Sequence, residues 1–355
     1  MRLISKTRRY RMDCDTALSI FARIRSLSSP SFLLESAEGG ENWARFSFMG
    51  TGAVATVEGR ADGVTLTFAG GETAHYPPGM RSLRDILNVL RTDPQQAWTA
   101  RRFPGGLVGY VAYDAVRDFE SVPDSDPDPS ARLFRFLAPE VLCRVDNFRQ
   151  QVGLTVFGDS HNDDAEARID ARLDEVEGLL MSSDLGEVVR CRPEGGVPEP
   201  SPISLTSNCS RQVYEDAVRK AKEYIKAGDI FQVVLSQRFS ATGVAHPPLE
   251  IYRRLRAENP SPYMFFFEFP DETLIGASPE VMVRLNGATA EVRPIAGTRP
   301  RGATLEADLE LERDMRDDPK EVSEHIMLLD LGRNDLGRVC QIGSIDIPEQ
   351  MVTER

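Results

Sequence analysis

The chain has 355 residues, of which 41% are hydrophobic and 27% charged, and this composition is typical of a soluble globular protein large enough for two domains. Its 42 basic and 55 acidic residues give a net charge of −13, which argues against a general nucleic-acid binder, because phosphate binding needs a basic surface. No segment has the apolar length of a transmembrane helix or a signal peptide, so we expect no membrane insertion. The five scattered cysteines, without a C-x-x-C pair, indicate reduced thiols and a cytoplasmic protein.

Two β-hairpins are predicted in the first part of the chain. Residues 52–57 and 64–68 flank a glycine-rich turn and predict one β-hairpin, and residues 140–145 with 152–157 predict a second. The proline-aspartate segment Pro123–Pro129 between them predicts a loop.

A surface helix and a linker follow. The helix is indicated by apolar residues at helical spacing among charged ones, namely Ile169, Leu173, Val176 and Leu180. Residues 192–207 carry four prolines and two glycines and predict a domain linker. We therefore expect an N-terminal domain over 1–190, a linker over 191–209 and part of a second domain over 210–355.

The second part mixes helices and strands in unequal runs. Ser210 starts a helical pattern that ends at Gly228, a residue that can adopt a left-handed cap. A strand is predicted over 231–239 and a helix over 248–258, which stops before Asn259-Pro260. These runs favour an α+β fold over regular βαβ alternation.

A further hairpin contains the first candidate site residue. Strands over 281–285 and 288–293 flank Asn286-Gly287, the strongest short hairpin signal. This turn predicts that Glu280 lies opposite Arg293. A cross-strand surface pair explains these two residues as well as a site does.

The last helix contains two further candidate residues. Asp318 is the expected N-cap, Pro319 the first helical residue, and Glu321 can reach back as in a capping box. Glu321 and Glu324 lie almost one turn apart, a spacing that suits carboxylate ligation of Mg²⁺. Helix capping for Glu321 and solvation for Glu324 are the alternatives that involve no ligand.

Seven segments together resemble the anthranilate synthase component I branch of the chorismate-utilising enzymes. They occur in family order and comprise LLES from Leu33, FPGGLVGYVAYDAVR from Phe103, GDIFQVVLSQRF from Gly228, NPSPYMFFF from Asn259, IGASPE ending at Glu280, RPIAGTRPRG from Arg293 and DPKEVSEHIMLLDLGRNDLGRVC from Asp318. The resemblance implies the family's α+β two-domain β-sandwich, with the second domain truncated, and a site in a cleft of the second half.

Two positions distinguish branches within the family. The isochorismate and salicylate branch has a lysine where this chain has Gln232, and the aminodeoxychorismate branch has a lysine where this chain has Ala296. The resemblance therefore implies amination of chorismate at carbon 2, loss of the 4-hydroxyl and elimination of pyruvate to give anthranilate, the first committed step of tryptophan biosynthesis.

The same resemblance assigns roles to individual residues. Glu280 becomes the general acid for the departing hydroxyl, a task that favours a dry pocket. Glu324 becomes a Mg²⁺ ligand with Glu321 beside it through water, and Gly297 and Thr298 contact chorismate. Mg²⁺ also explains how an acidic chain binds a dianion.

Regulation and a partner are implied as well. A feedback pocket for tryptophan is expected at Glu35, Ser36, Pro262, Tyr263 and Met264, although ordinary core packing explains the last three. Ammonia would come from a separate glutamine amidotransferase subunit, because no glutaminase nucleophile elbow is seen.

Family segments expected after residue 355 are missing from the sequence, so a further expectation is that this polypeptide alone lacks activity. The alternatives are an inactive fragment that acts only as a binding or interaction module, and an aminodeoxychorismate synthase-like enzyme.

Overall fold

The computed structural model describes residues 2–12, 14–36, 45–92, 103–122, 128, 130–182, 203–244 and 246–354. Their contacts define two units, which are treated separately: Met1–Gly186 with Tyr252–Arg355, and Glu187–Ile251. The first unit contains segments from both predicted domains. Most of the predicted linker and of the Pro123–Pro129 loop lies outside the described residues, and the predicted domain boundaries stay a prediction.

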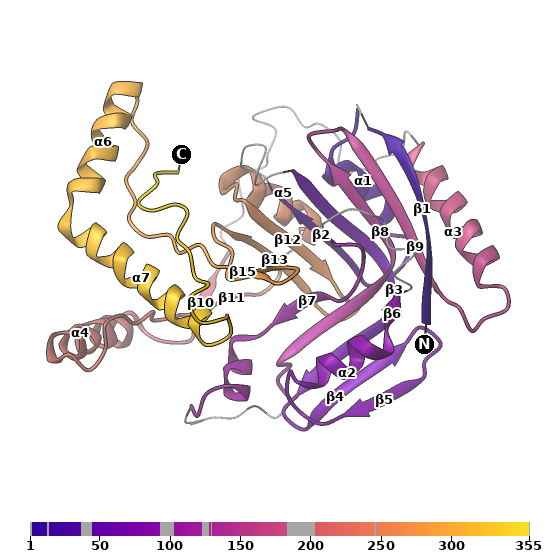
Figure 1. The fold of residues 1–355 in the computed structure, drawn as a ribbon, viewed down its shortest axis with the longest axis horizontal. Coiled ribbons are helices and arrows are strands. Elements are labelled where there is room, and N and C mark those ends of the chain that lie inside the picture. Colours follow the sequence, from indigo (N-terminus) through magenta and orange to yellow (C-terminus); the bar gives the residue numbers. More distant parts are fainter. Residues whose placement is uncertain are drawn as a thin grey trace. The chain divides into compact units, whose positions relative to one another are not determined.

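Within the described residues of the first unit, one large sheet contains eleven strands. They are β1 (Arg2–Arg11), β2 (Ser31–Glu35), β3 (Phe46–Arg60), β4 (Gly63–Phe68), β5 (Thr73–Tyr76), β6 (Arg91–Thr92), β7 (Val108–Val111), β8 (Phe134–Asp146), β9 (Gln151–Asp159), β12 (Tyr263–Glu268) and β13 (Thr273–Ser278). Their order is β13-β12-β2-β3-β8-β9-β1-β6, with β4 and β5 continuing from β3 and β7 pairing with β8 (Figure 1). Each pairing is antiparallel apart from β1 with β6.

The sheet bends where β3 changes partner. The ladder between β3 and β8 slips between Ala53 and Ala55, and Gly52 just before it has a φ of 68°, a left-handed conformation that favours glycine. The part of β3 before this bulge pairs with β2, and the part after it pairs with β4. Both predicted hairpins are confirmed, as β3–β4 and β8–β9.

Buried aromatic and aliphatic side chains from many strands make the core. Phe32, Val57, Phe134 and Leu137 are fully buried in one cluster, which Phe267 of β12 joins. Residues far apart in the sequence therefore share one core, and their burial supplies most of the stabilisation.

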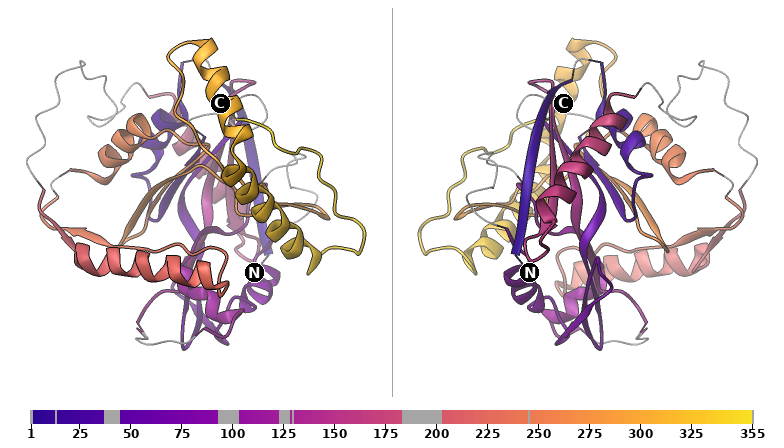
Figure 2. Two further views of the ribbon diagram at one scale, coloured as in Figure 1. Left: turned by 90° about the vertical axis from the view of Figure 1, so that its left-hand side faces the viewer. Right: turned by 90° about the vertical axis from the view of Figure 1, so that its right-hand side faces the viewer.

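Three α-helices lie among the described residues of the N-terminal part of the first unit: α1 (Ala17–Ile24), α2 (Ser82–Val89) and α3 (Ala165–Leu180). The predicted stripe of α3 is buried at Ile169, Leu173 and Val176, and Figure 2 shows this helix running beside β1. Lys6 and Arg8 of β1 pair with acids of α3 across this contact. The prediction of an amphipathic helix is confirmed.

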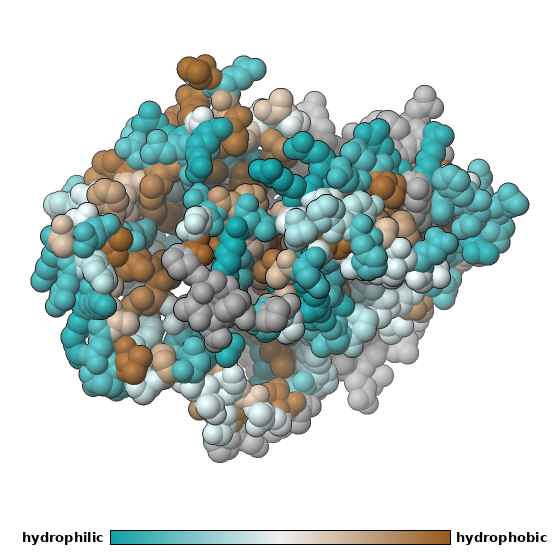
Figure 3. All heavy atoms as spheres, turned by 90° about the horizontal axis from the view of Figure 1, so that it is seen from below, coloured by the Kyte–Doolittle hydropathy of each residue, from teal (hydrophilic) through white to brown (hydrophobic). Residues whose placement is uncertain are grey.

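The rest of the first unit contains α5 (Pro248–Glu258) from Tyr252 onward, β14 (Arg284–Asn286), β15 (Thr289–Glu291), α6 (Leu305–Asp317) and α7 (Pro319–Gly337). The range predicted for the helix at 248–258 is confirmed. Among the described residues after Phe269, no apolar side chain is fully buried, and Leu305, Val339 and Ile342 are more than two-thirds exposed. Figure 3 shows one face of the molecule, on which hydrophobic residues at the surface are brown.

The second unit consists of α4 (Arg211–Ala227) and a short pairing of β10 (Leu205–Ser207) with β11 (Phe239–Ala241). Ser210 caps α4 and Gly228 ends it with a φ of 80°, as predicted. The predicted strand over 231–239 is wrong except at Phe239. Phe231 and Val234 are each 85% exposed, and a β-prone sequence forms a strand only where a partner and a buried face exist.

The described part of the chain includes no helix with the length and apolarity required to cross a bilayer. Mixed helices and a large antiparallel sheet confirm the α+β prediction.

Candidate functional site

The hairpin next to Glu280 forms, but with a different turn from the predicted one. Asn286 pairs with Thr289 and Arg284 with Glu291, so the two loop residues are Gly287 and Ala288. Gly287 has a φ of 62° and Ala288 is not among the positive-φ residues, whereas a turn on Asn286-Gly287 would need positive φ at both centres. The predicted placement of Glu280 opposite Arg293 is therefore wrong.

Glu280 instead contacts the segment that leads to Gly297. The backbone N–H of Ile295 donates to Glu280 Oε1 at 3.2 Å, and the Ser278 hydroxyl accepts from the Glu280 N–H at 3.4 Å. Glu280 is exposed, so the described residues do not provide the dry pocket that was expected around it. Arg293 pairs with Glu349 at 3.3 Å and with Glu354.

Gly297 and Thr298 lie in the irregular segment between β15 and α6. Gly297 has a φ of 82°, which a residue with a side chain adopts only under strain. A Cβ built on Gly297 would lie 3.4 Å from Glu321 Oε2, so this segment passes close to the first turn of α7.

Arg299 connects this segment to both C-terminal helices. Its guanidinium contacts Asp314 at 2.7 Å, Asp318 at 2.8 Å and Glu321 at 3.4 Å, and it donates to the carbonyl of Thr298 at 3.0 Å. The pKa of Arg299 is raised, first by its hydrogen bond to Asp314. Arg299 was not predicted as a site residue, because its three carboxylate partners cannot be identified from their spacing in the sequence.

Asp318 caps α7 and Pro319 follows it, as predicted, whereas the predicted capping box is not formed, because the Glu321 side chain contacts Arg299 and Lys320 instead. Asp318 accepts from the backbone N–H of Lys320 at 2.9 Å, which holds the pKa of its carboxyl below the usual value. Glu321 is the third helical residue, and its side chain, 16% exposed, lies near Arg299 and 3.6 Å from Lys320.

Glu324 lies on the same helix, three residues further on. No group of three or more histidine, cysteine or acidic side chains suited to a metal is found among the described residues.

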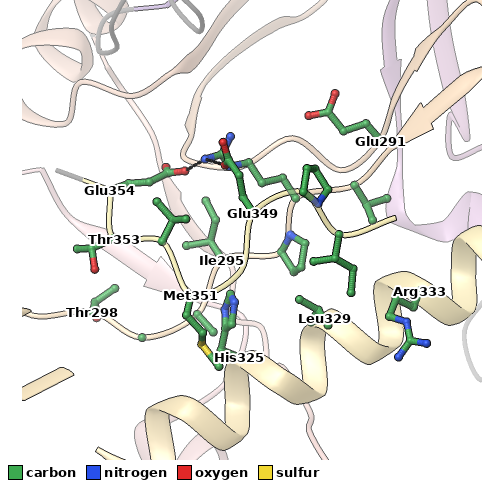
Figure 4. Close-up of a pocket in the computed structure, with 18 of the residues that line it drawn as sticks. Glu291, Ile295, Thr298, His325, Leu329, Arg333, Glu349, Met351, Thr353 and Glu354 are labelled. Carbon is green, nitrogen blue, oxygen red and sulfur yellow. Dashed lines mark hydrogen bonds and ion pairs between the residues drawn. The ribbon is translucent and has the colours of Figure 1, made fainter. Parts of the chain in front are cut away.

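A cavity of about 750 Å³ lies beside the same segment (Figure 4). Ile295, Ala296, Gly297 and Thr298 line it on one side, and His325 with Leu329 of α7 line it on another. Residues 344–349 and 351–354 belong to the lining as well, as do residues 289–294 and 299–301 and further side chains of α6 and α7. Gly297 and Thr298 are thus brought to a cavity, whereas Glu280, Glu321 and Glu324 are not among its lining residues.

His325 was missed as a cavity residue, although the sequence signal was available. His325 follows Glu324 directly and lies four residues after Glu321, on the same side of the helix, so its position could have been considered together with the carboxylates.

The residues predicted for regulation meet at the pairing of β2 with β12. Glu35 is the register partner of Met264, and both are buried. Glu35 accepts a hydrogen bond from Tyr252 at 2.7 Å and pairs with Arg256 at 2.9 Å. The hydroxyl of Tyr263 accepts from Arg284 at 3.2 Å, and Ser36 and Pro262 are partly buried beside these strands. The structure therefore brings Glu35 and Met264 together, across 228 intervening residues.

A family model described as chorismate binding enzyme matches residues 29–355. The chain therefore belongs to the chorismate binding enzyme family. Within it, the chain is 38% identical to anthranilate synthase component 1 of Acinetobacter calcoaceticus and to that of Aquifex aeolicus, with 97% of this chain and 69% of each relative covered.

Solved structures agree with this assignment. Anthranilate synthase component I from Streptococcus pneumoniae is 29% identical with a TM-score of 0.71, covering 88% of this chain and 66% of that chain. The menaquinone-specific isochorismate synthase of Escherichia coli is 15% identical with a TM-score of 0.61, covering 94% of this chain and 64% of its own, and shares the fold. The chain spans about two thirds of the length of these proteins.

Proposed function

We propose that this chain is the chorismate-binding large subunit of an anthranilate synthase, which aminates chorismate at carbon 2 and eliminates pyruvate. The observation that carries the proposal is the hydrogen bond from Ile295 to Glu280, because it ties the acid to the segment that contains Gly297 and Thr298. Ala296 in that segment lines the cavity and offers no amine nucleophile. This favours direct attack by ammonia over chemistry through a covalently bound lysine.

Glu280 is the proposed general acid. It would give a proton to the departing 4-hydroxyl while Gly297 and Thr298 position the ring through backbone and hydroxyl contacts. Closure of the site around the substrate would remove the water that now reaches Glu280.

Glu324 and Glu321 are the proposed ligands of Mg²⁺. Carboxylate oxygens are the donors this ion prefers, and Mg²⁺ commonly uses one or two carboxylates and keeps several waters, so the pair fits it. Glu321 would exchange its contacts with Arg299 and Lys320 for this role. When bound, the ion would neutralise the ring carboxylate of chorismate.

Ammonia would come from a glutamine amidotransferase subunit, and tryptophan would inhibit through the Glu35 and Met264 region. The numbering "component 1" of the relatives supports a partner subunit. A cytoplasmic location is part of the same proposal.

A second candidate is a chorismate-binding or interaction module without turnover. It is favoured by the exposure of Glu280 and by the absence of fully buried apolar side chains after Phe269 among the described residues. The aminodeoxychorismate alternative has no such support, because Ala296 replaces the expected lysine.

One assay separates these candidates. The chain is incubated with chorismate, Mg²⁺ and an ammonium salt, anthranilate is followed by its fluorescence, and the products are separated by chromatography. Anthranilate supports the first candidate, and chorismate binding without turnover supports the second. Aminodeoxychorismate or isochorismate as the product would refute the proposed chemistry.

A further inference from the structure

The face of the large sheet opposite α3 carries an arginine that is almost completely buried. Successive side chains of a strand point to opposite faces, so Arg8 of β1 faces the acids of α3, whereas Thr7 and Arg9 face the other side. On that other side, Arg9 of β1 and Arg144 of β8 are both register partners of Gly153, which has no side chain to separate them. Arg144 is 7% exposed, and a buried charge is costly unless it is compensated.

The charges around Arg144 are unequal in sign. Asp146 attracts the guanidinium of Arg144, whereas Arg9 and Arg45 repel it, and burial lowers the pKa of Arg144 to about 10. The Asp146 carboxylate also accepts from Nη2 of Arg45 at 2.9 Å and from the backbone N–H of Arg149 at 3.0 Å. Among the described residues, three guanidinium groups therefore share one carboxylate, and the local charge is positive although the whole chain is acidic.

A small cavity lies beside Arg144 on this face. Its lining includes Arg144, Thr7 and Thr155, which come from three neighbouring strands, and Phe103 and Pro104 from the segment before β7. Its volume of about 10 Å³ is comparable with the space that one water molecule or one monatomic ion needs. The cavity is therefore too small for a phosphate or a carboxylic acid.

The polar groups of the lining are suited to donate hydrogen bonds. Oγ1 of Thr7 and Oγ1 of Thr155 lie 2.9 Å apart, and this contact uses the hydrogen of only one hydroxyl, so the other hydroxyl can still donate. A guanidinium has donors and no acceptor, and its Nε in Arg144 is buried and makes no hydrogen bond with any described residue. The described lining residues include no carboxylate. Donors and positive charge without an acid favour an anion.

The apolar wall of the cavity is held in a strained conformation. Phe103 has a φ of 38°, which is uncommon for a residue with a side chain, and its ring packs edge-to-face on Phe48 with centroids 5.7 Å apart. Strained residues of this kind cluster at ligand sites. An apolar wall also lowers the local dielectric constant and so strengthens the attraction between Arg144 and an anion.

We propose that Arg144, Thr7 and Thr155 form a binding site for a monatomic anion of the halide class, with chloride as its ligand. The anion neutralises the buried guanidinium and accepts a hydrogen bond from the remaining hydroxyl. Because it binds the folded sheet and not the unfolded chain, it stabilises the fold. The site lies on the N-terminal strands and does not depend on the proposed catalytic function.

The test is thermal unfolding of the full chain in sodium chloride and in sodium gluconate at equal concentration, together with the line width of the chloride NMR signal. Chloride should raise the melting temperature by about 2 °C relative to gluconate, and bromide should act like chloride. The chain should also broaden the chloride signal in a saturable way. Arg144→Met should remove both effects, and Thr155→Val should weaken chloride binding about tenfold.

The matched control is Arg8→Gln, which removes the same charge from the same part of β1 but on the opposite face of the sheet. It should keep the full chloride response. If Arg144→Met does not fold, Thr155→Val, a change of similar volume, still tests the inference. An equal chloride response in the unaltered chain and in the variants at Arg144 or Thr155 would overturn it, as would a larger response to phosphate than to chloride.

Discussion

The backbone N–H of Ile295 donates to Glu280 Oε1 at 3.2 Å, which joins a side chain two residues beyond the end of β13 to the segment that leads into Gly297. This bond requires only an acceptor at Glu280, whereas the proposed proton transfer requires an acid. The two roles can therefore be separated by substitution.

Glu280→Gln keeps an amide oxygen for Ile295 and removes the acid. We expect anthranilate formation to fall by about 10² to 10⁴-fold, the usual contribution of a positioned general acid, with an unchanged melting temperature. Initial rates and a thermal melt check this together. A variant that keeps its activity would remove Glu280 from the mechanism.

Arg299→Gln removes a cation from among Asp314, Asp318 and Glu321. The three carboxylates would then repel one another, and we expect the first turn of α7 to exchange its amide hydrogens about tenfold faster. Hydrogen exchange read by mass spectrometry over 305–325 measures this.

The matched control for Arg299→Gln is Arg333→Gln, which lies in the later part of α7. Arg333 makes a single surface pair with Asp330 at 2.9 Å, so its loss should change exchange little. Similar effects of the two changes would show that Arg299 has no special role.

The stability of the first turn of α7 should decrease at acidic pH. Because the pKa of Asp318 is lowered from 3.8, its contribution to stability is complete above pH 3.8 and is lost as the pH falls below that value through the folded pKa. Asp318→Asn retains a cap without this titration. The protection factor of the Lys320 amide, which compares its exchange rate with that of an unprotected amide at the same pH, should fall in the unaltered chain below pH 3.8 and stay constant in the variant; identical profiles would contradict the assignment.

A substitution at Gly109 of β7 tests the pairing of β7 with β8. A Cβ at this position would collide with the backbone carbonyl of Arg135 on β8, so Gly109→Ala should lower the free energy of unfolding by about 1 to 3 kcal/mol. Gly178→Ala in α3 meets no atom within 4 Å and should stabilise by about 0.5 to 1 kcal/mol. Urea unfolding of both variants checks the contrast, and equal shifts would argue against this β7–β8 pairing.

Local signals in the sequence predicted much of the fold. The Asp318-Pro319 start of α7 and the left-handed glycine after α4 depend on neighbouring residues alone, and both are confirmed. Features that depend on distant partners were not predictable. The turn at Gly287 shifted because glycine tolerates its position in either hairpin register, and Phe231 lacks the buried face that a strand needs.

The candidate site was also predictable only in part. The placement of Gly297 at the edge of a cavity follows from the family motif, whereas the central position of Arg299 depends on three carboxylates that only the folded chain brings together.

Titration of the chain with chorismate in the presence and absence of Mg²⁺ tests the central claim most directly. We predict saturable binding at one site that strengthens with Mg²⁺, and that weakens about tenfold in Gly297→Ala, because alanine is strained at a φ of 82°. Absence of chorismate binding, or equal binding by the unaltered chain and Gly297→Ala, would contradict the account.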